Sequence, residues 1–318
     1  MASTVTTTSP LPHRLLAWAE ERFPFAHTPL YLVFYLAALL YGRSVVTHDR
    51  VWLAAGDLPG LAGVWSFFLL LRVLDEHKDY ALDTRNHPQR ALQRGVITLQ
   101  HLKIAGAIAV GVMVAVSLAK DRGLGPAMFF WAVLMVWTAL MAREFFCGDW
   151  LQRHLVLYAS THLLVLPLAV IWISTFGTDR VLLAPRVMAV ALFALLTGAA
   201  LEVVRKTRGP EEERTGVDSY TKALGPRGAP FAVGGLLTAA TVLEVVLVLH
   251  LDPGVAGGAL VLIPLGALAW AFASLARFVG APSESARKRN EVTVGLTVLT
   301  GYVVLIAGLS ARGGLQWR

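Results

Sequence analysis

Charged residues are scarce in this chain of 318 residues: they make up 15%, against 56% hydrophobic residues and a mean hydropathy of +0.60. A soluble domain carries about a quarter charged residues, so the composition excludes a string of soluble domains and predicts an integral membrane protein. The formal net charge is +7. In a membrane protein, Lys and Arg gather at the cytoplasmic face and meet anionic lipid or phosphorylated substrates. We therefore expect the lipid bilayer, and no nucleic acid, as a partner.

Cysteine is almost absent. Cys147 is the only one, which excludes an internal disulfide and a multi-cysteine metal site. Residues 1–26 lack the basic and then apolar pattern of a signal peptide. Leu15 to Phe23 instead predict a short amphipathic helix at the membrane interface. The chain also lacks a Walker loop and a Gly-x-Gly-x-x-Gly sequence after a strand, which argues against the common nucleotide-binding folds.

Long apolar runs dominate the chain. A membrane span needs about 20 mostly apolar residues, and we expect nine spans, at 28–47, 57–74, 102–119, 124–142, 154–175, 182–204, 229–250, 255–279 and 291–310. The sequence therefore predicts an all-α fold, with an N-terminal interfacial segment at 1–26 and a single transmembrane domain at 27–318. Two long charged loops, 75–101 and 205–228, interrupt the apolar pattern.

The basic residues predict an orientation. If the N-terminus lies inside, the inside segments carry 20 of the 28 Lys and Arg residues and the outside segments carry eight. Because cytoplasmic loops are enriched in Lys and Arg, we expect a cytoplasmic N-terminus and an external C-terminus. The same orientation places loops 75–101 and 205–228 on the cytoplasmic face.

Four carboxylates, Asp75, Glu76, Asp79 and Asp83, recur at steps of three and four after the second apolar run. In a helix these steps would bring all four to one face, where like charges repel. A divalent cation removes that conflict, because Mg²⁺ prefers hard oxygen ligands and completes its coordination with water and phosphate oxygens. The spacing favours a Mg²⁺ site at the end of a membrane helix. The alternative is an acidic helix end exposed to solvent.

The second charged loop mixes acids and bases. The acids are Glu202, Glu211, Glu212 and Glu213, and the bases are Arg205, Lys206, Arg208 and Lys222. Glutamate can ligate Mg²⁺, whereas basic side chains can bind a diphosphate but not a cation. For Glu211, Glu212 and Glu213 the alternative is a solvated loop. For Arg72, Glu202 and Arg205, which lie near helix ends, the alternative is snorkelling to the membrane surface.

The first motif resembles that of the UbiA-type intramembrane prenyltransferases. That family shows an Asn-Asp pair, followed by Asp three and seven residues after the pair. Asp79 and Asp83 match directly, while Asp75 stands in place of the Asn and Glu76 in place of the first Asp. The family's Pro-x-Arg-x-x-x-x-Gly ending is matched by Pro88, Arg90 and Gly95, and its second Gly, hydroxyl and Gly pattern by Gly216, Ser219, Tyr220 and Gly225.

The resemblance implies a central apolar chamber, capped by both loops, and Mg²⁺-dependent ionisation of a prenyl diphosphate. The implied metal ligands are Glu76, Asp79 and Asp83, with Asp75 in support and Glu202 for a second metal. The implied diphosphate-binding residues are Arg72, Lys78, Arg205, Lys206 and Lys222, with Tyr220 hydrogen-bonded to phosphate. The prenyl group would pass to an acceptor, aromatic or lipophilic.

Two alternatives stay open. In a UbiA-type terpene cyclase the double bonds of the substrate trap the allyl cation and no acceptor is needed. A membrane transporter also has charged loops beside broken spans. The Asp-Gly-x-x-Ala-Arg pattern of CDP-alcohol phosphotransferases, a rival class of membrane enzymes with Asp clusters, is missing.

Overall fold

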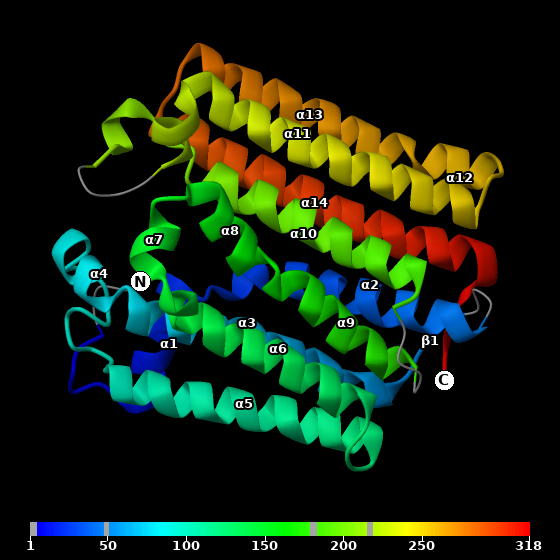
Figure 1. The fold of residues 1–318 in the computed structure, drawn as a ribbon, viewed down its shortest axis with the longest axis horizontal. Helices are drawn as coiled ribbons and strands as arrows, with labels where there is room; N and C mark the ends of the chain where they lie inside the picture. The colour runs from blue at the N-terminus through cyan, green and yellow to red at the C-terminus, as the bar shows by residue number, and fades with distance from the viewer. Residues whose placement is uncertain (1–4, 48–50, 179–182, 215–218) are drawn as a thin grey trace. The chain divides into compact units, whose positions relative to one another are not determined.

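Helices account for nearly all of the regular structure in the computed structural model, which describes residues 5–47, 51–178, 183–214 and 219–318 (Figure 1). Eight helices in this described part are long and apolar enough to cross a membrane, and the shorter apolar helix Pro126–Ala142 covers the remaining expected span. The expected all-α membrane fold is therefore confirmed. Gly216, one of the glycines of the second motif, lies outside the described residues.

The chain divides into two units, which are described separately. Unit 1 comprises Met1–Tyr35 and Gly56–Phe146, and unit 2 comprises Leu36–Ala55 and Cys147–Arg318. The helices of unit 1 are α1 (Leu11–Arg22), the first part of α2 (Thr28–Thr47), α3 (Leu58–Lys78), α4 (Tyr80–Asn86), α5 (Leu99–Asp121) and α6 (Pro126–Ala142). Helix α3 packs mainly against α5 and makes a smaller contact with α6.

Local signals fix the ends of the unit 1 helices. Thr98 and His101 form a capping box at the start of α5, in which each side chain bonds to the other residue's backbone N–H. Helix α5 ends at Asp121, and the following Arg122 adopts a left-handed conformation (φ 54°). Pro126 then begins α6 at a position where a helix needs no N–H donor. These signals allow the expected third and fourth spans to be placed to within a few residues.

Helix α1 is docked on unit 1 by its apolar face. Trp18 is 3% exposed and the following Phe23 is 4% exposed, and both belong to a core cluster with side chains of α3, α5 and residues 91–97. Phe23 also makes an edge-to-face contact with Trp65 of α3, with ring centroids 4.9 Å apart. The amphipathic helix expected at Leu15 to Phe23 is present, and its apolar face packs against the protein.

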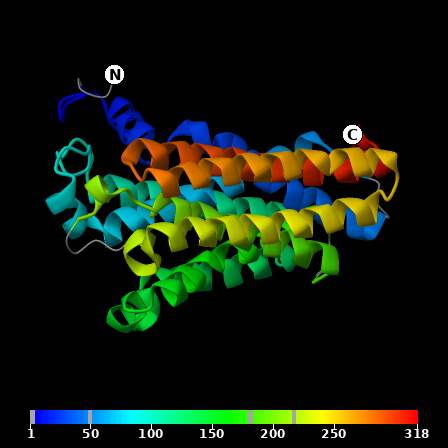
Figure 2. The ribbon, with the colours of Figure 1, turned by 90° about the horizontal axis from the view of Figure 1, so that it is seen from above.

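Unit 2 contains the remaining helices and the one small sheet of the described residues. Its elements are the second part of α2, β1 (Val51–Leu53), α7 (Gly148–Gln152), α8 (Leu155–Leu163), α9 (Val165–Gly177), α10 (Pro185–Arg205), α11 (Tyr220–Leu251), α12 (Val255–Leu260), α13 (Leu262–Gly280), α14 (Glu284–Gly313) and β2 (Leu315–Trp317). Strands β1 and β2 pair in parallel, with Val51 opposite Leu315. Helices α10, α11, α13 and α14 run along one another in both views (Figures 1 and 2).

Small residues let helices of unit 2 approach closely. A Cβ on Gly42 of α2 would lie 2.4 Å from the carbonyl oxygen of Ser174 in α9, and one on Gly177 would lie 2.4 Å from that of Leu39. Such contacts are typical of helix packing in membranes, where small residues allow close van der Waals contact. The backbone of α11 is interrupted at Gly225 (φ 77°, ψ 167°), directly before Pro226, a conformation that only glycine adopts easily.

The two charged loops are shorter than the sequence indicates. Helix α3 continues to Lys78 and α4 follows at once, so much of 75–101 is helical. Helix α11 begins at Tyr220, because Ser219 accepts a hydrogen bond from the Lys222 backbone N–H and caps the helix. The second loop therefore ends at residue 219. We call the described residues between 202 and 222, which include the adjoining ends of α10 and α11, the charged loop.

Candidate functional site

The four carboxylates of the first motif, Asp75, Glu76, Asp79 and Asp83, which we call the acidic motif, are divided between two helices. Asp75 and Glu76 lie in the last turn of α3, Asp79 separates α3 from α4, and Asp83 lies in α4. Asp79 has non-helical backbone angles (φ −90°, ψ 3°). The expected single helical face is therefore only partly realised.

Asp75 and Glu76 lie in different environments. The Asp75 side chain is 44% exposed, and its Oδ2 lies 3.6 Å from Nη1 of Arg72, one turn earlier in α3. Glu76 is 1% exposed, and its Oε1 accepts a hydrogen bond from Nε of Arg22, at the end of α1. Its other oxygen, Oε2, is buried without a hydrogen-bond partner among the described residues. A buried carboxylate needs such pairing, because desolvation disfavours its charge.

Asp83 is neutralised by arginines. Nη1 of Arg90 lies 2.6 Å from Oδ2 of Asp83, and Nη2 of Arg22 lies 3.5 Å from the same oxygen. Arg90 belongs to the Pro-x-Arg-x-x-x-x-Gly sequence and also lies 3.8 Å from the Glu21 carboxylate of α1. That sequence and α1 therefore both contribute to the surroundings of the acidic motif.

Asp79 is the member of the acidic motif with excess negative charge around it. Burial is the largest effect and raises the pKa of Asp79 above its ordinary value; Lys78 lowers it, and Asp75, Asp83 and Glu144 raise it further. Lys78 also pairs with Glu144, Nζ to Oε1 at 3.2 Å. The ionised form of Asp79 is therefore disfavoured in the unliganded protein, and an added positive charge would stabilise it.

Glu144, the partner of Lys78, lies in an unusual backbone turn after α6. Glu144, Phe145 and Phe146 all have positive φ, at 50°, 51° and 57°. Left-handed backbone costs a residue with a Cβ roughly 1–2 kcal/mol, and three in succession are rare. The Phe145 ring packs edge-on to Trp137 of α6, with centroids 5.2 Å apart. This turn places the Glu144 carboxylate beside Lys78.

The donor chemistry of the acidic motif suits Mg²⁺, although the side chains form no ready-made cage. In the described part of the chain, no group of three or more His, Cys, Asp or Glu residues is arranged to hold a metal ion. Mg²⁺ rarely uses an all-protein cage and is commonly bound by one or two carboxylates together with water and substrate phosphates. The under-neutralised Asp79 and the unpartnered Oε2 of Glu76 therefore fit a site completed by phosphate.

In unit 2, the acids and bases of the charged loop pair with each other. Glu202 lies 2.7 Å from Lys206 Nζ and also pairs with Arg205, both within one turn of α10. Lys222 lies 3.4 Å from Glu213. Tyr220 is buried, and its backbone N–H donates to the Lys206 carbonyl at 3.0 Å. Any phosphate bound by these lysines and arginines would compete with carboxylates already present.

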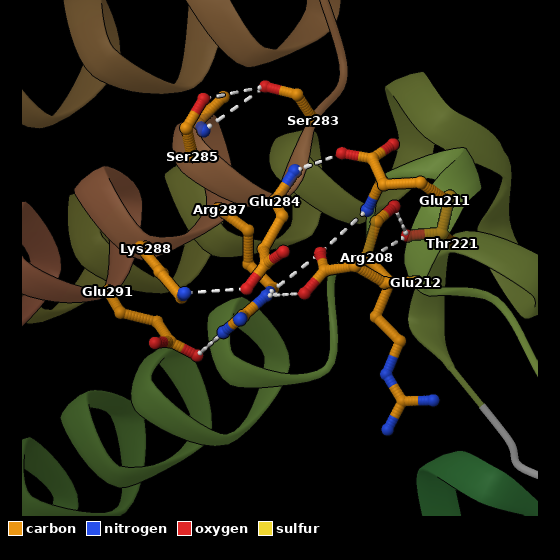
Figure 3. Close-up of polar contacts among 12 residues, drawn as sticks. Arg208, Glu211, Glu212, Thr221, Ser283, Glu284, Ser285, Arg287, Lys288 and Glu291 are labelled. Atoms are coloured by element: carbon orange, nitrogen blue, oxygen red, sulfur yellow. Dashed lines mark hydrogen bonds and ion pairs between the residues drawn. The ribbon is translucent and has the colours of Figure 1, made fainter.

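The charged loop is attached to the start of α14 (Figure 3). Arg287 Nε lies 2.8 Å and 3.0 Å from the two carboxylate oxygens of Glu212, and its Nη1 bonds to Glu291. The backbone N–H of Glu284, in the first turn of α14, donates to Glu211. Glu211 and Glu212 therefore both have protein contacts, although Glu211 is exposed to solvent and Glu212 is half-buried. We call this set of contacts the loop latch.

Three features of the structure were not singled out from the sequence. Arg22 and Glu21 of α1 are far from the motifs in sequence, and no spacing connects them. Glu144 directly follows Arg143 in the sequence and belongs to neither motif. Glu244 had a clear signal, since it is the only acidic residue of the 229–250 run. It is 2% exposed in α11, and its Oε1 has no hydrogen-bond partner in the described residues. Ionisable groups within membrane spans are commonly functional.

Comparison with solved structures identifies the fold. A UbiA homolog from Aeropyrum pernix K1, solved in its apo form, is similar with a TM-score of 0.66 at 16% identity, over 88% of this chain and 98% of that chain. The chain has the UbiA fold. A digeranylgeranylglyceryl phosphate synthase in membranes gives a TM-score of 0.58 at 15% identity, over 93% of this chain and 99% of that chain. No family model and no curated protein matches the sequence.

The UbiA fold agrees with the resemblance seen in the first motif. It extends over 93% and 88% of the chain in the two comparisons. At 15% and 16% identity the similarity establishes the fold, and the chemistry has to be argued from the side chains of this protein.

Proposed function

We propose that this protein is a Mg²⁺-dependent intramembrane prenyltransferase, which ionises a prenyl diphosphate and transfers the prenyl group to an aromatic or lipophilic acceptor. The observation that carries the proposal is the electrostatic state of Asp79, a carboxylate short of positive charge at the end of an apolar membrane helix. The UbiA fold supports it, as does similarity to a synthase of an isoprenoid lipid phosphate.

The acidic motif would bind the metal. Asp79 and Asp83 would hold Mg²⁺, with Asp75 beside them and Glu76 able to contribute its unpartnered Oε2. Mg²⁺ at this place would stabilise the negative charge that develops on the leaving diphosphate. Arg72 and Lys78 would bind phosphate oxygens, and each would exchange a carboxylate partner for them.

The charged loop would contribute further phosphate-binding groups. We assign this role to Arg205, Lys206 and Lys222, with Tyr220 as a hydrogen-bond donor. Glu202 has both oxygens engaged by Arg205 and Lys206, so release of these bases to phosphate would free it for a second metal. The bases of the charged loop would therefore exchange carboxylate oxygens for phosphate oxygens when the substrate binds.

The test is direct assay of purified protein with Mg²⁺ and C10, C15 and C20 prenyl diphosphates, with and without lipid extract, followed by product identification. We expect Mg²⁺-dependent release of diphosphate and a prenylated acceptor when extract is present. A cyclic hydrocarbon or alcohol formed without extract would favour the terpene cyclase. Failure to consume any of the three substrates would overturn the function.

Two variants test the metal site within this assay. Asp79→Ala and Asp83→Ala should each lower turnover by roughly a hundredfold or more, because a bound metal stabilises transition-state charge by several kcal/mol. Glu20→Ala, which removes an exposed acid of α1, is the matched control and should keep wild-type turnover. Near-wild-type rates in both aspartate variants would exclude the acidic motif as the metal site.

A further inference from the structure

Arg22 brings a guanidinium to the acidic motif from outside the motif. Its Nε donates to Oε1 of the buried Glu76, and its Nη2 lies 3.5 Å from Oδ2 of Asp83. The second distance is at the limit of a hydrogen bond, and Asp83 already has a closer partner in Arg90, at 2.6 Å. Arg22 is therefore held firmly through Nε and only loosely on its Nη side.

The helix that carries Arg22 is held in place along its length. Trp18 and Phe23 are buried in the core cluster on either side of Arg22. Glu21 accepts the Ala91 backbone N–H at 3.0 Å, and Arg14 Nε donates to the Val96 carbonyl. The Arg22 side chain itself is 17% exposed. A guanidinium held in this way loses little further freedom when it binds a ligand.

This arrangement explains why the chain has Glu76 where the resembled motif has Asp. Glu76 is 1% exposed and faces α1, and the extra methylene of glutamate extends its carboxylate toward Arg22. A guanidinium bound at Nε still presents its Nη donors in a fixed planar fork, which matches the oxygens of a phosphate.

We propose that Arg22 binds the diphosphate of the substrate, and that Glu76 is a positioning residue that orients its guanidinium through Nε. This inference rests on the prenyl-diphosphate function proposed above. It adds α1 to the substrate-binding machinery and gives Glu76 a role that does not depend on a metal. Lys78 and Arg72 lie on α3, so Arg22 would approach the diphosphate from a separate element of unit 1.

Metal dependence separates this role from metal ligation. The full-length protein in detergent is titrated with prenyl S-thiolodiphosphates, which bind without ionising readily, by calorimetry in EDTA and again in Mg²⁺. Arg22→Gln should raise Kd about ten- to hundredfold in both conditions, as expected for one charge-assisted contact. Asp79→Asn should raise Kd in Mg²⁺ alone. Glu76→Gln should resemble Arg22→Gln and weaken binding in EDTA as well.

Two further variants control for folding. Arg14→Gln removes the bond from α1 to Val96 without changing the charge at the acidic motif, and its Kd should stay near that of the wild type. Arg22→Lys keeps the charge opposite Glu76 but loses the fork, so it should fold and recover only part of the affinity. A loss with Arg14→Gln as large as with Arg22→Gln would mean that undocking of α1 explains the effect, and would overturn the proposal.

The remaining outcomes separate the two proposals. Unchanged Kd in Arg22→Gln, or in Arg22→Lys if the former does not fold, would overturn the role of Arg22 and leave the prenyltransferase function standing. A Glu76→Gln variant that loses affinity only in Mg²⁺ would make Glu76 a metal ligand and overturn its positioning role. A wild-type protein that binds none of the C10, C15 and C20 analogues in either condition would overturn the function itself.

Discussion

Asp79 differs from the other acids of the motif in how its charge is balanced. Glu76 and Asp83 have arginine partners, and Asp75 has Arg72. The neighbours of Asp79 include three carboxylates and the single base Lys78, which Glu144 shares. Repulsion of this kind destabilises the unliganded protein and favours cation binding, a compromise that is common at functional sites.

Replacement of Asp79 should therefore stabilise the metal-free protein. Because folding raises the pKa of Asp79, protonation of this acid favours the folded state. Its contribution to the free energy of unfolding is therefore complete below the ordinary pKa of about 3.9 and is lost as pH rises through the raised value. In EDTA, Asp79→Asn should unfold at a higher temperature than the wild type at pH 7.5, and the difference should shrink as pH falls toward 4. Glu20→Gln should show neither effect. A lower unfolding temperature for Asp79→Asn at pH 7.5 would contradict this account.

Lysines of the charged loop should affect diphosphate more than metal. Lys206 and Lys222 pair with Glu202 and Glu213, and ammonium groups can bind phosphate but cannot ligate a cation. Lys206→Ala and Lys222→Ala should each weaken diphosphate binding roughly ten- to hundredfold, with a smaller change in the Mg²⁺ concentration required. Separate titrations of Mg²⁺ and prenyl diphosphate, with Lys103→Ala as control, measure both. Wild-type diphosphate affinity in both variants would show that these lysines do not bind substrate.

Among the elements, the charged loop is ordered by α14 rather than by its own sequence. Both carboxylate oxygens of Glu212 accept hydrogen bonds from Arg287. Glu211 accepts a hydrogen bond from the backbone N–H of Glu284, in the first turn of α14. Carboxylates are favoured there, because a helix N-terminus carries partial positive charge. Gly209 packs directly against Ser283, where a Cβ would lie 2.8 Å from the serine backbone. The C-terminal helix therefore sets the conformation of the loop that carries Lys206.

Opening the loop latch should loosen the charged loop. Arg287→Ala removes a two-oxygen contact between largely buried side chains, 15% and 16% exposed, and charged hydrogen bonds of this kind contribute about 1.5–3 kcal/mol. We expect a lower unfolding temperature and faster hydrogen exchange at residues 206–214. Lys288→Ala removes an exposed pair with Glu284 at the same helix turn and should have little effect. Equal exchange in the wild type and in Arg287→Ala would show that the latch does not order the loop.

For the whole molecule, helix length and composition determine which segments can cross a bilayer. Among the residues that the structure describes, eight helices meet that requirement, and Pro126–Ala142 is a shorter apolar helix. Buried backbone groups in a membrane must bond within the segment, so long apolar stretches become helices. The direction of insertion is a separate matter, because it depends on the basic residues that flank the spans.

Orientation can be tested with terminal tags. From the distribution of 20 and eight basic residues among the two sets of segments, we expect a cytoplasmic tag at the N-terminus and an external tag at the C-terminus. Protease protection in sealed vesicles and in permeabilised cells reads out each tag. Protection of both tags on one side would contradict an odd number of spans, and a reversed result would place the acidic motif outside.

The sequence alone determined the membrane class, the helical spans and the position of the acidic motif at the end of one of them. These features depend on local composition and on periodicity, which act over a few turns and can be read residue by residue. The division of the carboxylates at Asp79 was not apparent, because a break between two short helices depends on one residue's backbone angles.

Only the tertiary structure decided which charged residues form ion pairs with one another. Arg22 lies more than 50 residues before Glu76, and Arg287 more than 70 residues after Glu212, and neither pair shares a periodic pattern. Burial had to be known as well, since Glu76 and Asp75 are neighbours in sequence yet 1% and 44% exposed. Electrostatic energies depend on distance and on solvent access, and both are set when α1 docks on unit 1 and α14 packs beside the charged loop.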